Sequence, residues 1–317
     1  MNKFTLYEAL QDGYNLIKTK DNSDELAKIG TWRGGTVGCI TEAGDFLGAD
    51  PRNAVLRFHG IQTDTDFDTN LMFQFGRFNE DGWAELLTAA DEQYKREEDI
   101  PMTRELVVDG TTHKITGRPD IVIMKDGTPH LGIELKQICS FHTAIKVANF
   151  ADNRPKTDHI IQAAGYSMYF DIPWVLAYTS RVNFPVLYGN PSKANPTGRF
   201  QCDHRALKKD DKGRAYSLNP FISMYDLTWD GDTLLVDGEP TLITKSGINR
   251  WYHYCATCVQ TKTIPTSIGG GIEYDGYAVD DTKNNNLMYF EFKEVPTNSF
   301  DEWISGCRAL TDTGVDK

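Results

Sequence analysis

Residues 115–138 read ITGRPDIVIMKDGTPHLGIELKQI, and the topology of the chain can be worked out from this segment. It contains two strand-like runs, 114–124 and 130–138, that are rich in β-branched and apolar residues. The dipeptide Asp126-Gly127 between them is a strong turn signal. The segment therefore predicts a β-hairpin.

The predicted hairpin gathers charged side chains on one patch. Glu134 and Lys136 are two residues apart, so they project from the same face of the second strand. If the loop has an odd length and is centred on Gly127, Asp120 lies directly across from Glu134. Two carboxylates and one ammonium group would then lie close together.

Such a patch suits a divalent cation. Like charges directly opposite each other destabilise a sheet, and two carboxylates plus water is a common way to hold Mg²⁺. The carbonyl of Leu135 could add an oxygen ligand, and Lys136 would orient attacking water or stabilise charge on a phosphate. The alternative is a solvated strand face with an ordinary Glu–Lys pair. Apolar neighbours of Asp120 and Glu134 favour the metal site, because a carboxylate in such surroundings needs a partner.

Helical and strand periodicities extend over most of the chain. Helices are expected within 1–30 and at 79–98, 157–170 and 249–261, a hairpin at 222–236, and strands at 174–182 and 287–292. This order predicts an α/β fold with a central mixed β-sheet flanked by helices. We expect an N-terminal helical and loop region over 1–70, a core over 71–265 and a tail of unassigned role over 266–317.

Four elements in a fixed order carry a family resemblance. They are Gly76-x-x-x-Glu80 before a helix, Gly117-Arg118-Pro119-Asp120 before three apolar residues, Glu134-Leu135-Lys136, and Gln162-x-x-x-Tyr166. This set resembles the RecB-like branch of the PD-(D/E)xK nuclease superfamily. Residues 51–60 are also similar to the segment that precedes the nuclease core in phage-encoded members.

The resemblance implies a restriction-endonuclease-like core and a role for each matching residue. The implied metal ligands are Glu80, Asp120, Glu134 and the Leu135 carbonyl, the implied catalytic residues are Glu80, Asp120, Glu134 and Lys136, and the implied contacts to the DNA backbone are Gln162 and Tyr166. The implied cofactor is Mg²⁺ or Mn²⁺.

Two of these assignments have structural alternatives. Glu80 could be a carboxylate that the helix dipole favours near a helix N-terminus, and Glu85 is a rival for the same motif position. The glycine spacing from Gly76 favours Glu80. Tyr166 could be an ordinary half-buried aromatic residue beside Tyr169.

The cysteines match a further family feature only in part. Many RecB-like relatives hold an iron–sulfur cluster with one cysteine before the core and three after it. Here Cys39 precedes the core and Cys255-x-x-Cys258 follows it, with no fourth thiol nearby. Because four thiolates are the usual requirement, an iron–sulfur cluster is not expected and buried free thiols are. A zinc site that uses His253 or His204 is the alternative.

The overall charge argues against a DNA partner at first sight. The chain has 45 acidic and 33 basic residues, a net charge of −12, whereas a protein that grips phosphates needs a positive surface. The segment 136–160 is an exception, with Lys146, Arg154 and Lys156 as candidate substrate contacts and two histidines as further donors. A second basic stretch covers 193–212. We therefore expect DNA binding to be confined to residues 136–160 and their neighbours and to be weak without divalent metal.

The expected function is a metal-dependent DNA exonuclease that hydrolyses phosphodiester bonds with metal-activated water, in phage or bacterial DNA recombination or processing. The alternatives are an endonuclease of the same superfamily, of restriction or structure-specific type, and a non-catalytic nucleic-acid-binding relic. Single- or double-stranded DNA ends are the expected partner, with a recombination protein or a second copy as further candidates. No signal-peptide-like or membrane-length apolar run is present, so we expect a cytoplasmic location, in the host if phage-encoded, and no membrane partner.

Overall fold

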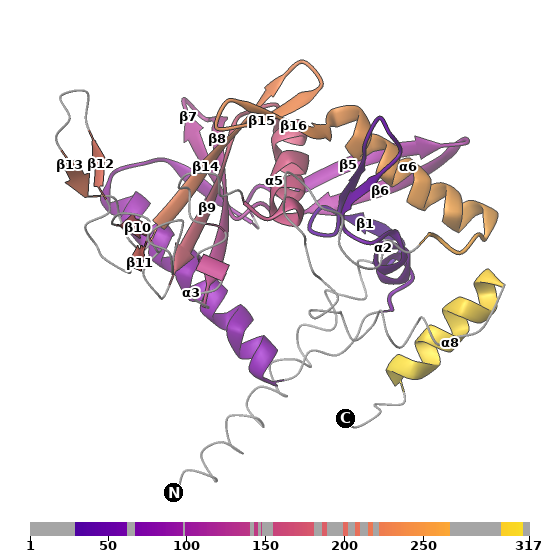
Figure 1. Ribbon diagram of the computed structural model, residues 1–317. Coiled ribbons are helices and arrows are strands. Elements are labelled where there is room, and N and C mark those ends of the chain that lie inside the picture. The colour runs from indigo at the N-terminus through magenta and orange to yellow at the C-terminus, as the bar shows by residue number, and fades with distance from the viewer. Residues whose placement is uncertain are drawn as a thin grey trace, which may run out of the picture. The chain divides into compact units, whose positions relative to one another are not determined.

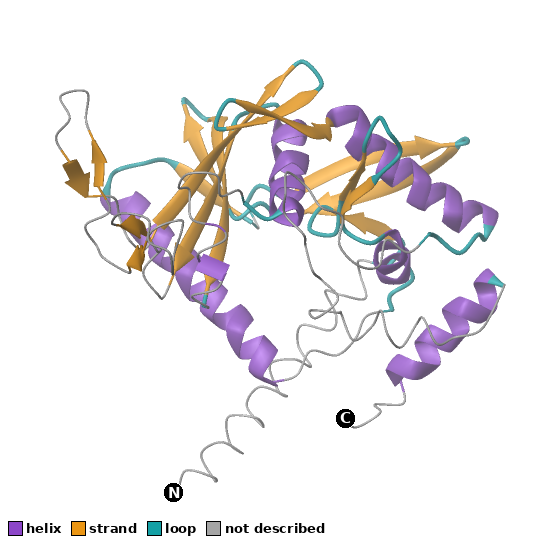
Figure 2. Cartoon of the chain, in the orientation of Figure 1, coloured by secondary structure: helices purple, strands orange, loops and turns teal. Residues whose placement is uncertain are grey.

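The computed structural model describes residues 29–61, 67–97, 99–139, 143–144, 147, 155–180, 186–188, 199–201, 207–209, 215–217, 222–266 and 299–312. Over this part the chain has a mixed α/β structure with mixed sheets flanked by helices (Figures 1 and 2). It divides into two compact units. Unit 1 comprises Met1–Gln74, Met102–Gly117 and Ser246–Lys317, and unit 2 comprises Phe75–Pro101 and Arg118–Lys245. No described helix is long and apolar enough to span a membrane.

Unit 2 is built around a seven-stranded mixed sheet with the order β16-β15-β14-β9-β8-β7-β4. Strands β8 and β9 are parallel, and the other neighbours are antiparallel. The strands are β4 (Tyr94–Arg96), β7 (Ile121–Lys125), β8 (Thr128–Ile138), β9 (Trp174–Ser180), β14 (Ile222–Asp230), β15 (Thr233–Val236) and β16 (Glu239–Thr244). Two short antiparallel pairs join β10 (Val186–Tyr188) to β11 (Arg199–Gln201) and β12 (Leu207–Lys209) to β13 (Ala215–Ser217).

Helices α3 (Phe67–Ala89) and α5 (Thr157–Phe170) pack on opposite faces of this sheet. In α3, Trp83 and Leu87 pack on a cluster of buried apolar side chains: Ile121, Ile133, Leu135 and Ala177. Side chains alternate along a strand, so Glu134 points to the other face. There α5 packs through Tyr166, whose ring centroid lies 5.8 Å from that of Trp174. The segment around Glu134 is therefore enclosed between sheet and helix.

The hairpin of β7 and β8 has the predicted alignment but not the predicted loop. Its turn has two residues, Asp126 and Gly127, with φ of 50° and 77°, as a type I′ turn requires. The expected odd-length loop centred on Gly127 is therefore wrong. A register shift follows, because the adjacent β7 residues Ile123 and Met124 pair with Leu131 and Pro129, so that β8 carries one extra residue there. Beyond this shift Ile121 pairs with Ile133. That pairing is the predicted one, and it brings Asp120 level with the middle of β8.

Other expectations are met in part. The helix predicted at 157–170 is confirmed, and the predicted strand at 174–182 and hairpin at 222–236 match β9 and β14–β15. The strand expected at 114–124 is interrupted before Asp120, because Pro119 cannot donate a ladder hydrogen bond. The helix expected at 79–98 ends earlier, and β4 follows it. The expected strand at 287–292 and nearly all of the helical region 1–30 lie outside the described residues.

The described part of unit 1 contains a three-stranded sheet, a two-stranded sheet, the first residues of α3 and three further helices. The first sheet has the order β1 (Thr31–Arg33), β6 (Thr111–Gly117), β5 (Met102–Val108), and β2 (Gly38–Ile40) pairs with β3 (Phe46–Gly48). The helices are α2 (Pro51–Phe58), α6 (Lys245–Thr261) and α8 (Phe300–Asp312). The expected core at 71–265 coincides with neither unit, because the β5–β6 hairpin pairs with β1 through β6.

Candidate metal centre

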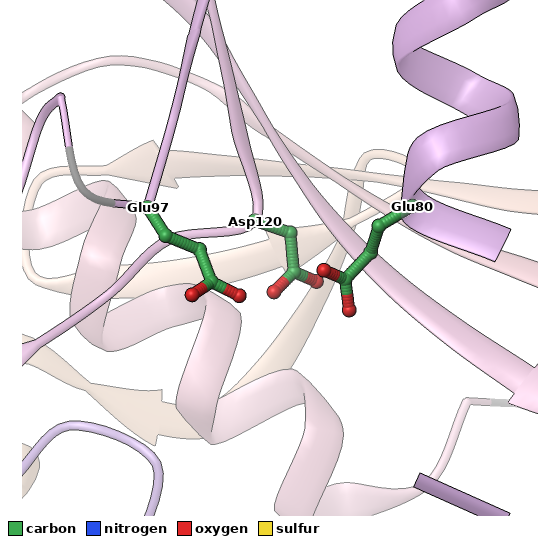
Figure 3. Close-up of side chains that lie close together, drawn as sticks. All are labelled: Glu80, Glu97 and Asp120. Atoms are coloured by element: carbon green, nitrogen blue, oxygen red, sulfur yellow. The ribbon is translucent and has the colours of Figure 1, made fainter. Parts of the chain in front are cut away.

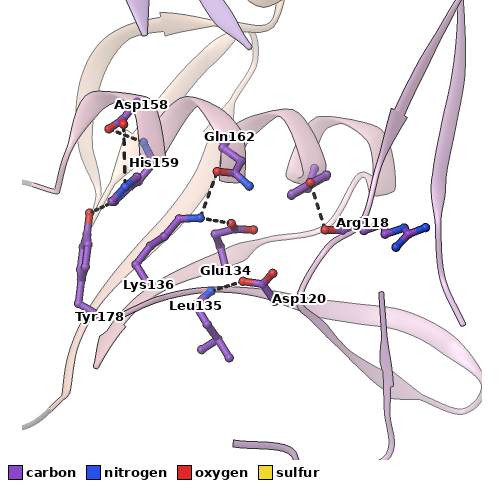
Figure 4. Close-up of polar contacts among 10 residues, drawn as sticks. Arg118, Asp120, Glu134, Leu135, Lys136, Asp158, His159, Gln162 and Tyr178 are labelled. Atoms are coloured by element: carbon purple, nitrogen blue, oxygen red, sulfur yellow. Dashed lines mark hydrogen bonds and ion pairs between the residues drawn. The ribbon is translucent and has the colours of Figure 1, made fainter. Parts of the chain in front are cut away.

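Asp120 is held against the neighbouring strand by a backbone hydrogen bond. It follows Pro119 and directly precedes β7, and its Oδ2 accepts a hydrogen bond from the Leu135 amide at 2.6 Å (Figure 4). This contact crosses the hairpin at the position that the predicted register assigned to the carboxylate pair. The same peptide segment carries Glu134 and the carbonyl of Leu135, the other two ligands expected on β8.

Glu134 and Lys136 lie side by side on the face of β8 that α5 covers. The Lys136 Nζ donates to Glu134 Oε1 at 2.6 Å and to Gln162 Oε1 at 3.1 Å (Figure 4). The Glu134 side chain is 0% exposed. Its second oxygen, Oε2, is buried and has no hydrogen-bond partner among the described residues. A buried carboxylate oxygen without a donor is costly, so this atom is a fitting ligand for a cation.

Tyr166, for which the family resemblance implies a DNA contact, is buried and hydrogen-bonded to the chain's own backbone. It is 2% exposed, and its hydroxyl donates to the Arg118 carbonyl at 3.2 Å. The hydroxyl is therefore turned toward the backbone just before Asp120 and not toward solvent. In this structure Tyr166 supports the segment that carries Asp120, whereas Gln162, one turn earlier on α5, does face the site.

Glu80 joins Asp120 from α3, together with a residue that the sequence interpretation missed. Glu80, Glu97 and Asp120 each offer one carboxylate oxygen, and these oxygens all lie within 4.8 Å of one another (Figure 3). Glu97 directly follows β4. The sequence did not indicate Glu97, because this residue falls within the helix expected at 79–98. No glycine or proline marks the true end of α3. Asp91 instead adopts a left-handed conformation there, with φ of 59°, and aspartate tolerates this better than most residues.

Of the two glutamates of α3 that the sequence offers as a ligand, Glu80 lies in the carboxylate group and Glu85 does not. Glu80 lies 13 residues into the described helix α3, whose first residue is Phe67, so its position does not reflect a helix N-terminus. Glu85 is exposed and is not part of the carboxylate group. The structure therefore places Glu80, the residue favoured by the glycine spacing, beside Asp120.

The carboxylates repel one another in a partly desolvated site. Burial raises the pKa of Glu80 to about 7, with repulsion from Glu97 adding to this and Arg96 opposing it. Burial, followed by the charge of Glu134, raises the pKa of Asp120 well above its usual value. Burial also raises the pKa of Glu134, although Lys136 opposes the shift. A bound cation would favour the ionised form of every one of these groups.

Lys136 stays charged in these surroundings. Burial lowers the pKa of an ammonium group, but here the carboxylates of Glu134 and Asp120 outweigh it, so the pKa of Lys136 is raised. An ammonium has three donors, and the two hydrogen bonds to Glu134 and Gln162 use two of them. One donor remains for a water molecule or a phosphate oxygen.

A second polar group lies beside Lys136 on α5. The His159 Nδ1 is 3.0 Å from the Tyr178 hydroxyl, which also accepts a hydrogen bond from the Lys156 amide at 3.1 Å (Figure 4). Burial lowers the pKa of His159 to about 4, and the charge of Lys136 acts in the same direction. The imidazole is therefore neutral near pH 7. It can offer a neutral hydrogen bond but no positive charge to DNA.

Of Lys146, Arg154 and Lys156, the basic residues expected to contact DNA, only Lys156 lies among the described residues. Lys156 is exposed at the start of α5. Lys146 and Arg154 lie outside the described residues, as does most of the basic stretch 193–212.

The cysteines of unit 1 form no cluster in the described part of the chain. Cys255, Cys258 and Cys307 are buried and free, and Cys39 is buried. Burial raises the pKa of Cys255 and Cys307, the latter to about 12, so these two thiols are protonated near neutral pH. The described groups of three or more metal-binding side chains include no cysteine or histidine. His204, one of the alternative zinc ligands, lies outside the described residues.

Comparison with known proteins adds little to these observations. No family model matches the chain, and no curated protein matches it. One solved structure, described as the crystal structure of SSO0001, is similar over 56% of this chain and 73% of that chain. The two are 19% identical with a TM-score of 0.34, and a likeness at this level assigns neither a fold family nor a function.

Proposed function

We propose that this protein is a Mg²⁺- or Mn²⁺-dependent deoxyribonuclease whose unit 2 is a restriction-endonuclease-like core. One observation carries the proposal. The carboxylate of Glu134 is fully buried, with one oxygen on Lys136 and the other without a partner among the described residues, next to Asp120. A buried acidic group of this kind calls for a cation, and the adjacent ammonium suits reaction at a phosphate.

The residues present fit a hard divalent cation. Glu80, Asp120 and Glu134 offer only carboxylate oxygens, and Mg²⁺ and Mn²⁺ prefer oxygen ligands. The Leu135 carbonyl would be a further oxygen ligand. When bound, the cation would act as a Lewis acid toward a phosphate oxygen and lower the pKa of water.

The side chains have separable tasks in phosphodiester hydrolysis. Asp120 and Glu134 would hold the cation, and Glu80 would complete the site from α3. Lys136 is fixed by Glu134 and Gln162, so its remaining proton can orient the attacking water or stabilise negative charge on the phosphate. The amide nitrogen of Gln162 is left to donate to a backbone phosphate. Water attacks in line with the leaving oxygen, and no covalent intermediate is needed.

An exonuclease in phage or bacterial DNA recombination or processing is the form of this activity that we favour. The support is the resemblance of the four ordered motifs to RecB-like, phage-encoded nucleases. DNA ends are the proposed substrate. An endonuclease of the same superfamily would use the same residues, because the chemistry of the core is shared.

A cleavage assay on four DNA substrates tests the proposal. The full chain would be incubated with Mg²⁺ or Mn²⁺ and linear, closed circular, single-stranded or end-blocked DNA. We expect degradation from free ends and little loss of closed circles. Rapid cutting of closed circles would instead identify an endonuclease. Intact DNA in all four reactions, with either metal, would contradict the proposal.

A further inference from the structure

Glu97 is absent from the motif set that suggested a nuclease, yet it lies in the centre. Its carboxylate oxygen is within 4.8 Å of those of Glu80 and Asp120, and Asp120 lies between the two glutamates in Figure 3. The three residues come from α3, from the end of β4 and from the start of β7. Separate elements of unit 2 thus converge on one point.

An ion pair joins the segment that carries Glu97 to the helix that carries Glu80. The Arg96 guanidinium lies 2.8 Å from Asp81 Oδ1 and 3.9 Å from Glu80 Oε2. Because Arg96 and Glu97 are adjacent, as are Glu80 and Asp81, this pair ties β4 to α3 beside the centre. Arg96 is engaged by Asp81, and Lys136 by Glu134. Both of these cations are therefore shared with carboxylates outside the group of Glu80, Glu97 and Asp120.

A second observation, independent of the acidic group itself, indicates a ligand. Glu134 is 0% exposed, and its Oε2 has no partner among the described residues. Its charge also acts on both Asp120 and Glu80. Glu134 directly precedes Leu135, whose amide donates to Asp120 at 2.6 Å, and the Glu134 and Asp120 carboxylates are drawn next to each other in Figure 4. A cation bound beside Asp120 would therefore also be close to this buried oxygen.

We propose that Glu97 is a fourth carboxylate ligand and that the centre takes up its divalent cation before DNA binds. Mg²⁺ in phosphoryl-transfer sites is commonly held by one or two carboxylates plus substrate phosphates, so its uptake depends on the substrate. Four carboxylates on a fixed frame do not need that help. The inference rests on the proposed function, since it adds a ligand and an order of binding to that enzyme.

Calorimetric titration of the metal-free full chain with Mn²⁺ alone, at pH 8, tests this inference. We expect wild type to bind Mn²⁺ in the absence of DNA and Glu97→Gln to bind about tenfold or more weakly, because affinity follows the charge of the ligands. The matched control is Glu85→Gln, an exposed glutamate of α3 outside the carboxylate group. It should bind as wild type does. Circular dichroism would show that each variant is folded.

The outcomes separate this inference from the proposed function. Wild type that cleaves DNA with Mn²⁺ but binds no Mn²⁺ below millimolar concentration without DNA would overturn the inference alone. So would Glu97→Gln that binds within twofold of wild type. Mn²⁺ binding that depends on Glu97, in a protein that cleaves no DNA, would retain the cation site and contradict the nuclease.

Discussion

The Lys136 ammonium lies 2.6 Å from one oxygen of Glu134, while the other oxygen of that carboxylate is buried without a partner in the described part of the chain. Only one of the two carboxylate oxygens of Glu134 therefore has a hydrogen-bond partner among the described residues. An ordinary structural salt bridge would have both oxygens paired, since a buried ion pair is stabilising only when its remaining hydrogen-bonding groups are met.

Replacing Lys136 should destabilise the metal-free protein. Lys136→Met leaves Glu134 as an uncompensated buried carboxylate, which costs about 3 kcal/mol of unfolding free energy. Adding Glu134→Gln to this variant should recover much of the loss, because the buried charge is then gone. Urea unfolding of the single and double variants measures both effects. A double variant that is less stable than Lys136→Met would show that the charge is not the cause.

The ionisation of Glu80 should make stability depend on pH. Its pKa is raised from 4.5 to about 7, so between these values the folded protein keeps a proton that the unfolded chain releases. The stabilisation is complete below pH 4.5 and is lost as the pH rises to about 7. Metal-free wild type should therefore lose on the order of 2 kcal/mol more than Glu80→Gln between pH 5 and pH 8.

Denaturant titrations at the two pH values test this dependence, with Glu85→Gln as the control that should follow wild type. Mn²⁺ at pH 8 should restore stability to wild type, because the cation binds ionised carboxylates. Equal pH dependence of wild type and Glu80→Gln would contradict the electrostatic account of Glu80.

Tyr166 should matter for stability more than for DNA binding. Tyr166→Phe removes the hydrogen bond to the Arg118 carbonyl and should cost about 1 kcal/mol, while keeping the ring that packs near Trp174. DNA affinity and its dependence on salt concentration should stay unchanged. A loss of affinity with a smaller salt slope would instead identify the backbone contact that the family resemblance implied.

Gly132 is required where β8 passes Trp174. A Cβ at this position would overlap the Trp174 ring, so Gly132→Ala should destabilise the protein by about 1–3 kcal/mol. Gly82→Ala is the matched control, since a Cβ there meets nothing within 4 Å and alanine favours a helix by about 1 kcal/mol. Thermal melting of both variants should give shifts of opposite sign, and equal shifts would contradict the packing of β8 against β9.

The part of the centre that follows strand periodicity could be predicted from sequence. Asp120, Glu134 and Lys136 were placed together because side chains alternate along a strand and a hairpin aligns its two arms. The predicted loop differs from the observed turn by one residue, and one extra residue on β8 compensates for this difference. A turn dipeptide indicates where a hairpin bends, but it does not reveal such an irregularity.

Other parts of the site could not be predicted from sequence, because tertiary contacts determine them. Glu97 was missed because a left-handed aspartate, Asp91, ends α3 in place of a glycine. The helical spacing of Gln162 and Tyr166 places both on one face of α5. Periodicity does not indicate how deeply each side chain is buried, and Tyr166 is buried. The proposed DNA contacts Lys146 and Arg154 stay predictions from sequence.

The measurement that tests the central claim most directly is the rate of nucleotide release from end-labelled linear DNA in Mn²⁺. Wild type would be compared with Asp120→Asn, Lys136→Met and the control Glu85→Gln. We predict release by wild type and the control, abolished by a chelator, and a fall on the order of 10²–10³-fold in the other two variants. Equal rates in all four proteins, or release that survives the chelator, would contradict a metal centre built on Asp120, Glu134 and Lys136.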